Sequence, residues 1–110
     1  MPLTFENRAN AFEAKFAHDE EVRFRTLARR DKLFVRWVST EHKLSASDSD
    51  ELLDAVMAVR DGPGHDAALL MLVRTKVTSG QGETANKLEA ALLSCAVQAQ
   101  EQILTQLGAR

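Results

Sequence analysis

The sequence contains no proline and no glycine between Leu3 and Arg60, so no residue in its first half interrupts a helix. Thr4 is a suitable N-cap, and a one-sided apolar pattern continues from there to about Lys43. The apolar residues at helical spacing are Phe5, Ala9, Phe12, Phe16, Phe24, Leu27, Phe34 and Val38. The sequence therefore predicts one helix over residues 4–43, which runs about 60 Å at roughly 1.5 Å per residue.

Three shorter helices are predicted after the long one. The second follows a capping cluster at residues 45–50 and stops at the Asp-Gly-Pro-Gly sequence of residues 61–64. The third spans about residues 65–80, and the fourth spans about residues 84–108. Their predicted core-facing residues are Leu52, Leu53, Val56, Met57, Val59, Leu69, Leu70, Leu72, Val73, Val77, Leu88, Leu92, Cys95, Ala99, Ile103 and Leu107. No run alternates like a strand, so the predicted fold is all-α, a small four-helix bundle with short connections.

The predicted first helix is longer than the rest of the chain can cover. A compact chain of 110 residues has a diameter of roughly 35 Å. We therefore expect about half of the helix to project, to fold back at a break, or to be disordered in the isolated protein. The half near Trp37 has the wider apolar face and is expected to pack in the bundle.

The narrow apolar stripe before His18 lies between charged residues, and an isolated helix of this length is only marginally stable. We expect this segment to be loosely ordered alone and helical once the stripe occupies a groove on a partner. The sequence thus predicts two parts, an N-terminal arm over residues 1–18 and a four-helix body over residues 19–110.

The composition excludes several classes of protein. Hydrophobic residues make up 45% and charged residues 27%, which is typical of a globular chain. The net charge of −2 argues against a nucleic-acid partner or an anionic membrane surface. No apolar run approaches the roughly 18 residues of a membrane span, and the N-terminus has no signal-like pattern. We expect a cytoplasmic protein with no nucleic-acid partner and no direct membrane insertion.

Little in the sequence indicates an active site. His18, His42 and His65 lie in three separate segments without the spacing of metal ligands, so no metal and no cofactor is predicted. Cys95 lies on the apolar stripe of the last helix and is interpreted as a buried, inert thiol. The loop at residues 61–64 lacks the lysine of a P-loop and is interpreted as a turn. The chain is not expected to be an enzyme.

Six basic residues are concentrated between positions 23 and 36, namely Arg23, Arg25, Arg29, Arg30, Lys32 and Arg36. Nucleic-acid binding is one interpretation of such a cluster. The acidic residues Glu20, Glu21 and Asp31 lie beside or among the basic ones, however, so a solvated or partner-facing helix surface is favoured. Arg29, Arg30 or the Gly-Pro-Gly loop could alternatively contact a nucleotide or another anion.

Phenylalanines at helical spacing usually belong to a core, but here the bundle is too small to cover them all. Burying one such ring against a partner is worth about 1.5–3 kcal/mol, and repeated anchors of this kind are typical of a helix that binds in a groove. Phe5, Phe12 and Phe16 are the predicted anchors. The full set of predicted partner contacts is Phe5, Arg8, Phe12, Glu13, Lys15, Phe16, His18, Asp19 and Glu20.

Two strings in this region support a family resemblance. Residues 12–19 read FEAKFAHD, and residues 28–33 read ARRDKL. Together with the flanking aromatic residues they make residues 5–37 closely resemble the ATPase inhibitor subunit zeta family of alphaproteobacteria. Relatives tend to have Asn and Gly where this chain has Asp31 and Val35.

The resemblance implies a four-helix protein that binds the catalytic head of the F-type ATP synthase, at the cytoplasmic face of the inner membrane. It implies that the N-terminal helix enters the cleft between a catalytic and a non-catalytic subunit and blocks rotation in the hydrolysis direction. It also implies weak ATP or ADP binding at the bundle. Two other functions are kept as alternatives, a structural adaptor or assembly factor that binds through its bundle, and a nucleotide-sensing bundle.

Overall fold

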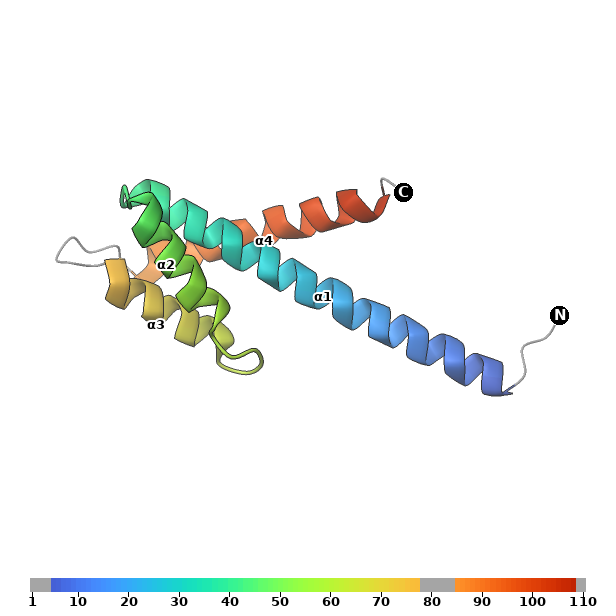
Figure 1. The fold of residues 1–110 in the computed structure, drawn as a ribbon. Coiled ribbons are helices and arrows are strands. Elements are labelled where there is room, and N and C mark those ends of the chain that lie inside the picture. Colours follow the sequence, from blue (N-terminus) through green and yellow to red (C-terminus); the bar gives the residue numbers. More distant parts are fainter. Residues whose placement is uncertain (1–4, 78–84, 109–110) are drawn as a thin grey trace.

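The computed structural model describes residues 5–77 and 85–108, with side chains described for residues 18–77 and 86–107. This part of the chain forms four helices, α1 (Phe5–Glu41), α2 (Ala46–Met57), α3 (His65–Val77) and α4 (Ala85–Gly108), and no strand (Figure 1). The all-α prediction is confirmed. The predicted N-cap Thr4 and the predicted start of the fourth helix at residue 84 lie outside the described residues.

Local sequence explains where the helices begin and end. The α1 helix ends at Glu41. Two residues later Lys43 has a φ of 51°, and the backbone N–H of Leu44 donates to the carbonyl of Ser39 at 2.9 Å. Ser45 caps α2, since its hydroxyl accepts the Asp48 N–H at 3.1 Å. Gly62 and Gly64, at φ values of 108° and 86°, turn the chain into α3.

One predicted boundary is wrong. The second helix was expected to continue to residues 61–64, but α2 ends at Met57, and Val59 lies beyond it in an irregular connection. Ala58 is the C-cap of α2, and its backbone N–H donates to the carbonyl of Asp54. The backbone then leaves the helix before the glycines, so the glycines make the turn into α3 and do not end α2.

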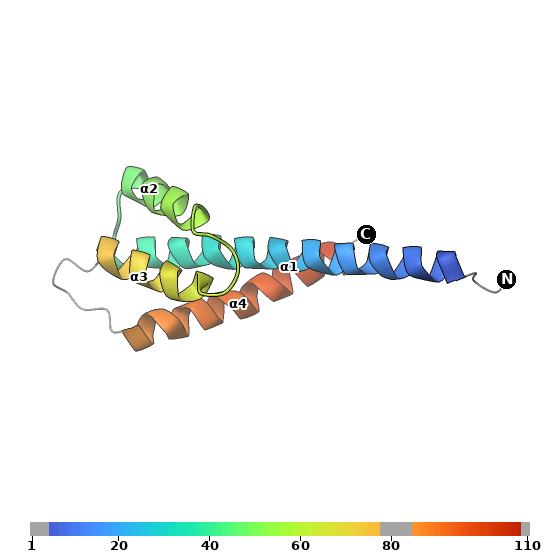
Figure 2. The same ribbon diagram turned by 90° about the horizontal axis from the view of Figure 1, so that it is seen from below.

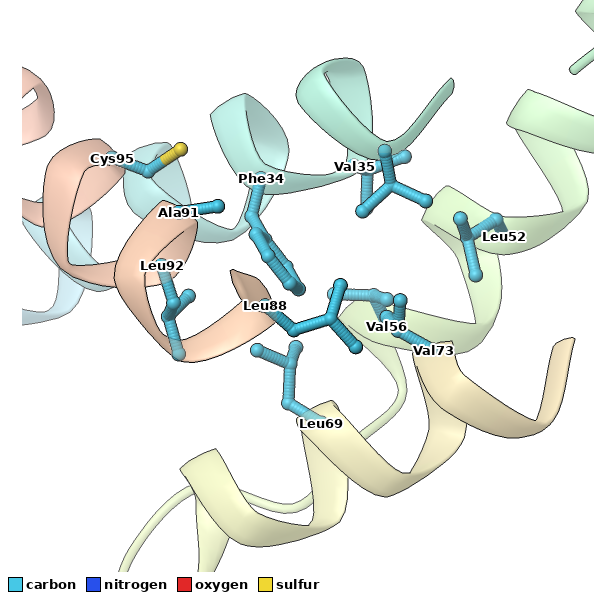
Figure 3. Close-up of a cluster of buried hydrophobic side chains, with 11 residues drawn as sticks. Phe34, Val35, Leu52, Val56, Leu69, Val73, Leu88, Ala91, Leu92 and Cys95 are labelled. Carbon is cyan, nitrogen blue, oxygen red and sulfur yellow. The ribbon is translucent and has the colours of Figure 1, made fainter. Parts of the chain in front are cut away.

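The core lies where all four helices meet, at the C-terminal half of α1 (Figure 3). Phe34 is fully buried at its centre, and Trp37 stacks on it with ring centroids 6.3 Å apart. The buried apolar residues are Phe34, Val35, Val38, Leu52, Val56, Leu69, Val73, Leu88, Ala91, Leu92, Cys95, Ala99 and Ile103. They include the predicted stripe of the last helix from Leu88 to Ile103. Phe24, which the same reasoning placed on the apolar face of the first helix, is 62% exposed.

The α4 helix runs antiparallel along α1, and two contacts mark the ends of their overlap. Arg25 donates to the side-chain oxygen of Gln106 at 3.3 Å at one end. Lys87 lies 3.6 Å from Glu41 at the other. The α2 and α3 helices cover the C-terminal half of α1 only (Figures 1 and 2). The body therefore supports α1 from about residue 25 to its end.

The remainder of α1 projects. The helix has 37 residues and is about 55 Å long at roughly 1.5 Å per residue. The radius of gyration is 18.0 Å, well above the about 13 Å of a compact chain of this length, and the molecule measures 66 × 29 × 25 Å. Of the three predicted arrangements the structure has the projecting helix, without a break. Loose order of residues 1–18 in the isolated protein stays a prediction.

None of the helices, over the residues described, combines the length and apolarity needed to cross a bilayer.

Candidate protein-binding surface

The N-terminal part of α1 is the first candidate surface, because the body leaves it uncovered. From Phe5 to Phe24 the helix extends about 30 Å beyond the contact of Arg25 with α4. Figure 1 shows it clear of the other three helices. Six predicted contact residues lie on this helical backbone with side chains outside the described set, namely Phe5, Arg8, Phe12, Glu13, Lys15 and Phe16.

The other three predicted contact residues, His18, Asp19 and Glu20, are all exposed on α1. Glu20 pairs with Arg23 at 3.5 Å, and both side chains are more than half exposed. Such a surface ion pair contributes little to stability and can exchange for a partner's charges at small cost. Phe24, one turn further, adds an exposed aromatic ring. The described end of this surface thus offers exchangeable charges and one apolar anchor.

A buried charge cluster, which the sequence reasoning missed, joins α1 to α3. Arg30 is 6% exposed and Asp31 is 4% exposed. The Arg30 guanidinium donates to Oδ1 of Asp31 at 2.8 and 2.9 Å, and to Oδ1 of Asp66 at 2.8 Å. His65 completes the cluster, with Nε2 2.9 Å from the second oxygen of Asp31. The prediction of a solvated or partner-facing side chain is therefore wrong for Arg30, because its guanidinium is bonded to two carboxylates within the protein.

These contacts shift the pKa values of the charged groups in the expected directions. Burial alone would lower the pKa of Arg30, but the hydrogen bonds to Asp66 and Asp31 outweigh it and raise it. The hydrogen bond from Arg30 lowers the pKa of Asp66. Burial raises the pKa of the Cys95 thiol, against the opposing charge of Arg30. The predicted burial of Cys95 is confirmed, and its inertness stays a prediction.

A second surface is a concavity of about 550 Å³ between the end of α1 and the start of α2. Three cations, Lys32, Arg36 and Lys43, line it, and none of its described lining residues is a carboxylate. Its other lining groups are mainly hydroxyls and apolar side chains, namely Val35, Ser39, Thr40, Leu44, Ser45, Ala46, Ser49 and Leu53. By contrast, the concavity beside the Gly-Pro-Gly loop contains the carboxylates of Asp61 and Asp66. An anion is therefore better matched to the first concavity than to the loop.

A third surface is the outer face of α4. Leu93, Val97 and Leu104 are 70%, 58% and 56% exposed, and their spacing places them on one side of the helix. This side is opposite the stripe that α4 buries against α1.

Comparison with known protein families identifies the family of the chain. A family model described as ATPase inhibitor subunit zeta matches residues 2–102. The chain belongs to the ATPase inhibitor subunit zeta family. The match extends the resemblance noted for residues 5–37 through α2, α3 and most of α4. Neither the curated proteins nor the solved structures contain a match to this zeta-family chain.

The zeta-family chain has several accessible surfaces and one buried polar cluster. Over the described side chains, no three His, Cys, Asp or Glu residues are grouped to hold a metal ion. The most buried polar side chains, Arg30 and Asp31, bond one another and the start of α3. The three accessible surfaces described above are the projecting helix, the cationic concavity and the outer face of α4.

Proposed function

We propose that this zeta-family chain is a non-catalytic regulator that inhibits ATP hydrolysis by the F-type ATP synthase. Its N-terminal arm enters the interface between a catalytic and a non-catalytic subunit of the catalytic head and blocks rotation in the hydrolysis direction. It acts at the cytoplasmic face of the inner membrane. The observation that supports this proposal is the extension of α1, which continues about 30 Å past its last contact with the body.

The dimensions suit insertion of a helix. An α-helix with its side chains is about 10–12 Å wide, whereas the molecule measures 29 × 25 Å across its shorter axes. A groove that admits α1 therefore excludes the body, and entry stops near Arg25, where α4 begins to cover the helix. The body sets the depth of insertion at about 30 Å.

The predicted anchors give the insertion its affinity. Phe5, Phe12 and Phe16 are spaced by seven and four residues, which is the spacing of one helix face. Each ring contributes about 1.5–3 kcal/mol when buried. The helical backbone that the structure has from Phe5 onward is the conformation that places these rings on one face. Arg8 and Lys15 are proposed to pair with acidic groups of the partner, and Glu13 and Glu20 with basic ones.

No bond is made or broken by the inhibitor, so inhibition follows from differential binding. The arm binds one rotary state of the catalytic head more tightly than the others and increases its population. Rotation then requires release of the arm, and the hydrolysis rate falls in proportion to the fraction of heads occupied.

Deletion of residues 2–18 tests the proposal. The shortened chain is assayed against ATP hydrolysis by the purified catalytic head, and its thermal unfolding is compared with that of the full chain. We expect inhibition to be lost while the unfolding temperature stays nearly unchanged, because the described body contacts begin near Arg25. Leu93→Ser, on the outer face of α4, is the matched control and should still inhibit. Undiminished inhibition by the shortened chain would rule out the mechanism.

A structural adaptor or assembly factor is the second candidate, and the exposed apolar face of α4 favours it. In that case the body carries the binding energy. The arm-deleted chain would then still copurify with the catalytic head, whereas Leu93→Ser combined with Val97→Ser would not. The inhibitor proposal expects the opposite pattern.

Weak ATP or ADP binding is proposed as an accessory property, and the cationic concavity between α1 and α2 favours it over Arg30 and the Gly-Pro-Gly loop. Titration with ATP or ADP should shift the amide resonances of Ser45 and Ser49 and leave those around Gly62 unchanged. Lys43→Glu should abolish the shifts, whereas Lys76→Glu, at a concavity that already contains two carboxylates, should not. Shifts centred on Gly62 would place the site at the loop.

A further inference from the structure

The buried cluster of Arg30, Asp31, His65 and Asp66 joins two helices that are distant in sequence. Arg30 and Asp31 lie on α1, and their side chains are 8% and 6% exposed. His65 and Asp66 are the first two residues of α3, and the His65 side chain is only 12% exposed. Two contacts cross between the helices, Arg30 to Asp66 at 2.8 Å and His65 to Asp31 at 2.9 Å. The cluster thus fixes the start of α3 to the middle of α1.

Both ring nitrogens of His65 face oxygen atoms. Nδ1 lies 3.0 Å from the main-chain carbonyl of Arg60, and Nε2 lies 2.9 Å from Oδ2 of Asp31. A carbonyl and an ionised carboxylate can only accept hydrogen bonds. Each nitrogen must therefore carry a hydrogen, which only the doubly protonated imidazolium provides. A neutral ring would leave one of the two oxygens facing a lone pair.

The charges of the cluster are compatible with the same protonation state. With His65 protonated, the cations Arg30 and His65 face the carboxylates of Asp31 and Asp66, so the four groups are neutral together. Asp66 is 59% exposed, so the charge that a protonated His65 meets in the buried part of the cluster is the carboxylate of Asp31.

We propose that His65 is a proton-dependent clasp, which holds the start of α3 against α1 when protonated and releases it when the proton is lost. This inference concerns the body alone and does not rest on the proposed inhibition. The core residues Leu69 and Val73 follow the clasp on α3. Release of His65 therefore weakens the docking of α3 and of the connection from α2.

The charged groups around His65 come from every element packed there. On α1 they are Arg30 and Asp31, and Arg23 lines the adjoining concavity. Asp66 belongs to α3, and Asp61 lies in the connection from α2. On α4, Cys95 is close enough for the charge of Arg30 to act on it, and its thiol is neutral. An experiment that follows the titration of His65 must distinguish it from any titration of these groups.

The direction of the pH effect follows from the contacts. Burial alone would lower the pKa of His65, but the hydrogen bonds to Asp31 and to the Arg60 carbonyl, with the charge of Asp31, outweigh it and raise it. A raised pKa in the folded state adds stability below the ordinary value of about 6.5, and this stability is lost as the pH rises through the folded value. The clasp therefore closes in mildly acidic solution and opens on the alkaline side.

Nuclear magnetic resonance of the full chain tests the clasp directly. At pH 6 the ring nitrogens of His65 should have imidazolium chemical shifts, and the midpoint of titration should lie above about 6.5. Asp31→Asn should move that midpoint downward. A neutral ring at pH 6, or a midpoint at or below the ordinary value, would overturn the proposal. The protonation state and titration midpoint of His65 are measured on the unmodified chain, so they test the proposal even if Asp31→Asn does not fold.

Thermal unfolding supplies an independent readout. His65→Gln keeps a neutral donor at the site but cannot gain a proton. The unfolding temperature of the natural chain should fall more between pH 6 and pH 9 than that of His65→Gln. His18→Gln, at an exposed position on the projecting part of α1, is the matched control and should retain the natural profile. Identical profiles for His65→Gln and the natural chain would contradict the clasp.

Discussion

Replacement of Arg30 by methionine should destabilise the body severely, although an arginine on a helix is usually a surface residue. Arg30 donates three hydrogen bonds of 2.8–2.9 Å to two carboxylates. Methionine has a similar length and no charge, so it leaves Asp31 buried without its cation. Removal of one partner from a buried ion pair costs about 3–5 kcal/mol.

The structure places the loss near the lower end of that range. Asp31 keeps its contact with His65 at 2.9 Å. Asp66 is 59% exposed, so water can solvate it once Arg30 is gone. We expect a loss of about 3 kcal/mol, out of a total of about 5–15 kcal/mol for a domain of this size.

Urea unfolding followed by circular dichroism at 222 nm measures this loss. At a slope of about 2 kcal/mol per molar urea, the midpoint should fall by about 1.5 M. Arg29→Met, at the neighbouring position, is the matched control and should change stability by less than about 0.5 kcal/mol. The double variant Arg30→Met with Asp31→Leu should be more stable than Arg30→Met alone, because no buried charge then lacks a partner. Equal midpoints for Arg30→Met and Arg29→Met would refute the reasoning.

Two further predictions concern the core and the cap of α2. Phe34→Ala, at a fully buried position, should lower the free energy of unfolding by about 3–5 kcal/mol. Phe24→Ala, at a 62% exposed position, should change it by less than about 0.5 kcal/mol. Similar losses in urea unfolding for both variants would show that the ring of Phe24 is buried in solution. Ser45→Ala removes the hydroxyl that accepts the Asp48 N–H and should cost about 1 kcal/mol. Ser47→Ala, two residues further along the chain, is its control, and an equal loss there would contradict the capping role.

The fold could be predicted largely from the sequence because its signals are local and periodic. The stripe from Leu88 to Ile103 repeats at intervals of three and four residues, and those residues are buried in α4. The absence of proline and glycine between Leu3 and Arg60 predicted a long first helix. Its length predicted that the body could not cover it, and projection is one of the three arrangements that this left open. The end of α2 was missed because the sequence has no helix-breaking residue at Met57.

The buried charge cluster could not be predicted in the same way, because it depends on how α3 docks on α1. Asp31 and His65 are 34 positions apart in sequence, and nothing near either residue specifies the other. Charged residues are also rarely buried unless paired, so a solvated surface was the reasonable expectation for Arg30. The exposure of Phe24 was missed for a related reason. The apolar pattern identifies a face of α1, but it does not show where α4 stops covering that face.

Site-specific photocrosslinking to the purified catalytic head during ATP hydrolysis tests the central claim most directly. A photoreactive amino acid is placed at Phe12 on the projecting part of α1, and in a second protein at Leu104 on the outer face of α4. The account predicts that position 12 crosslinks to both a catalytic and a non-catalytic subunit, and that position 104 does not. Crosslinks from position 104 with none from position 12 would show that the body makes the inhibitory contact and would contradict the account.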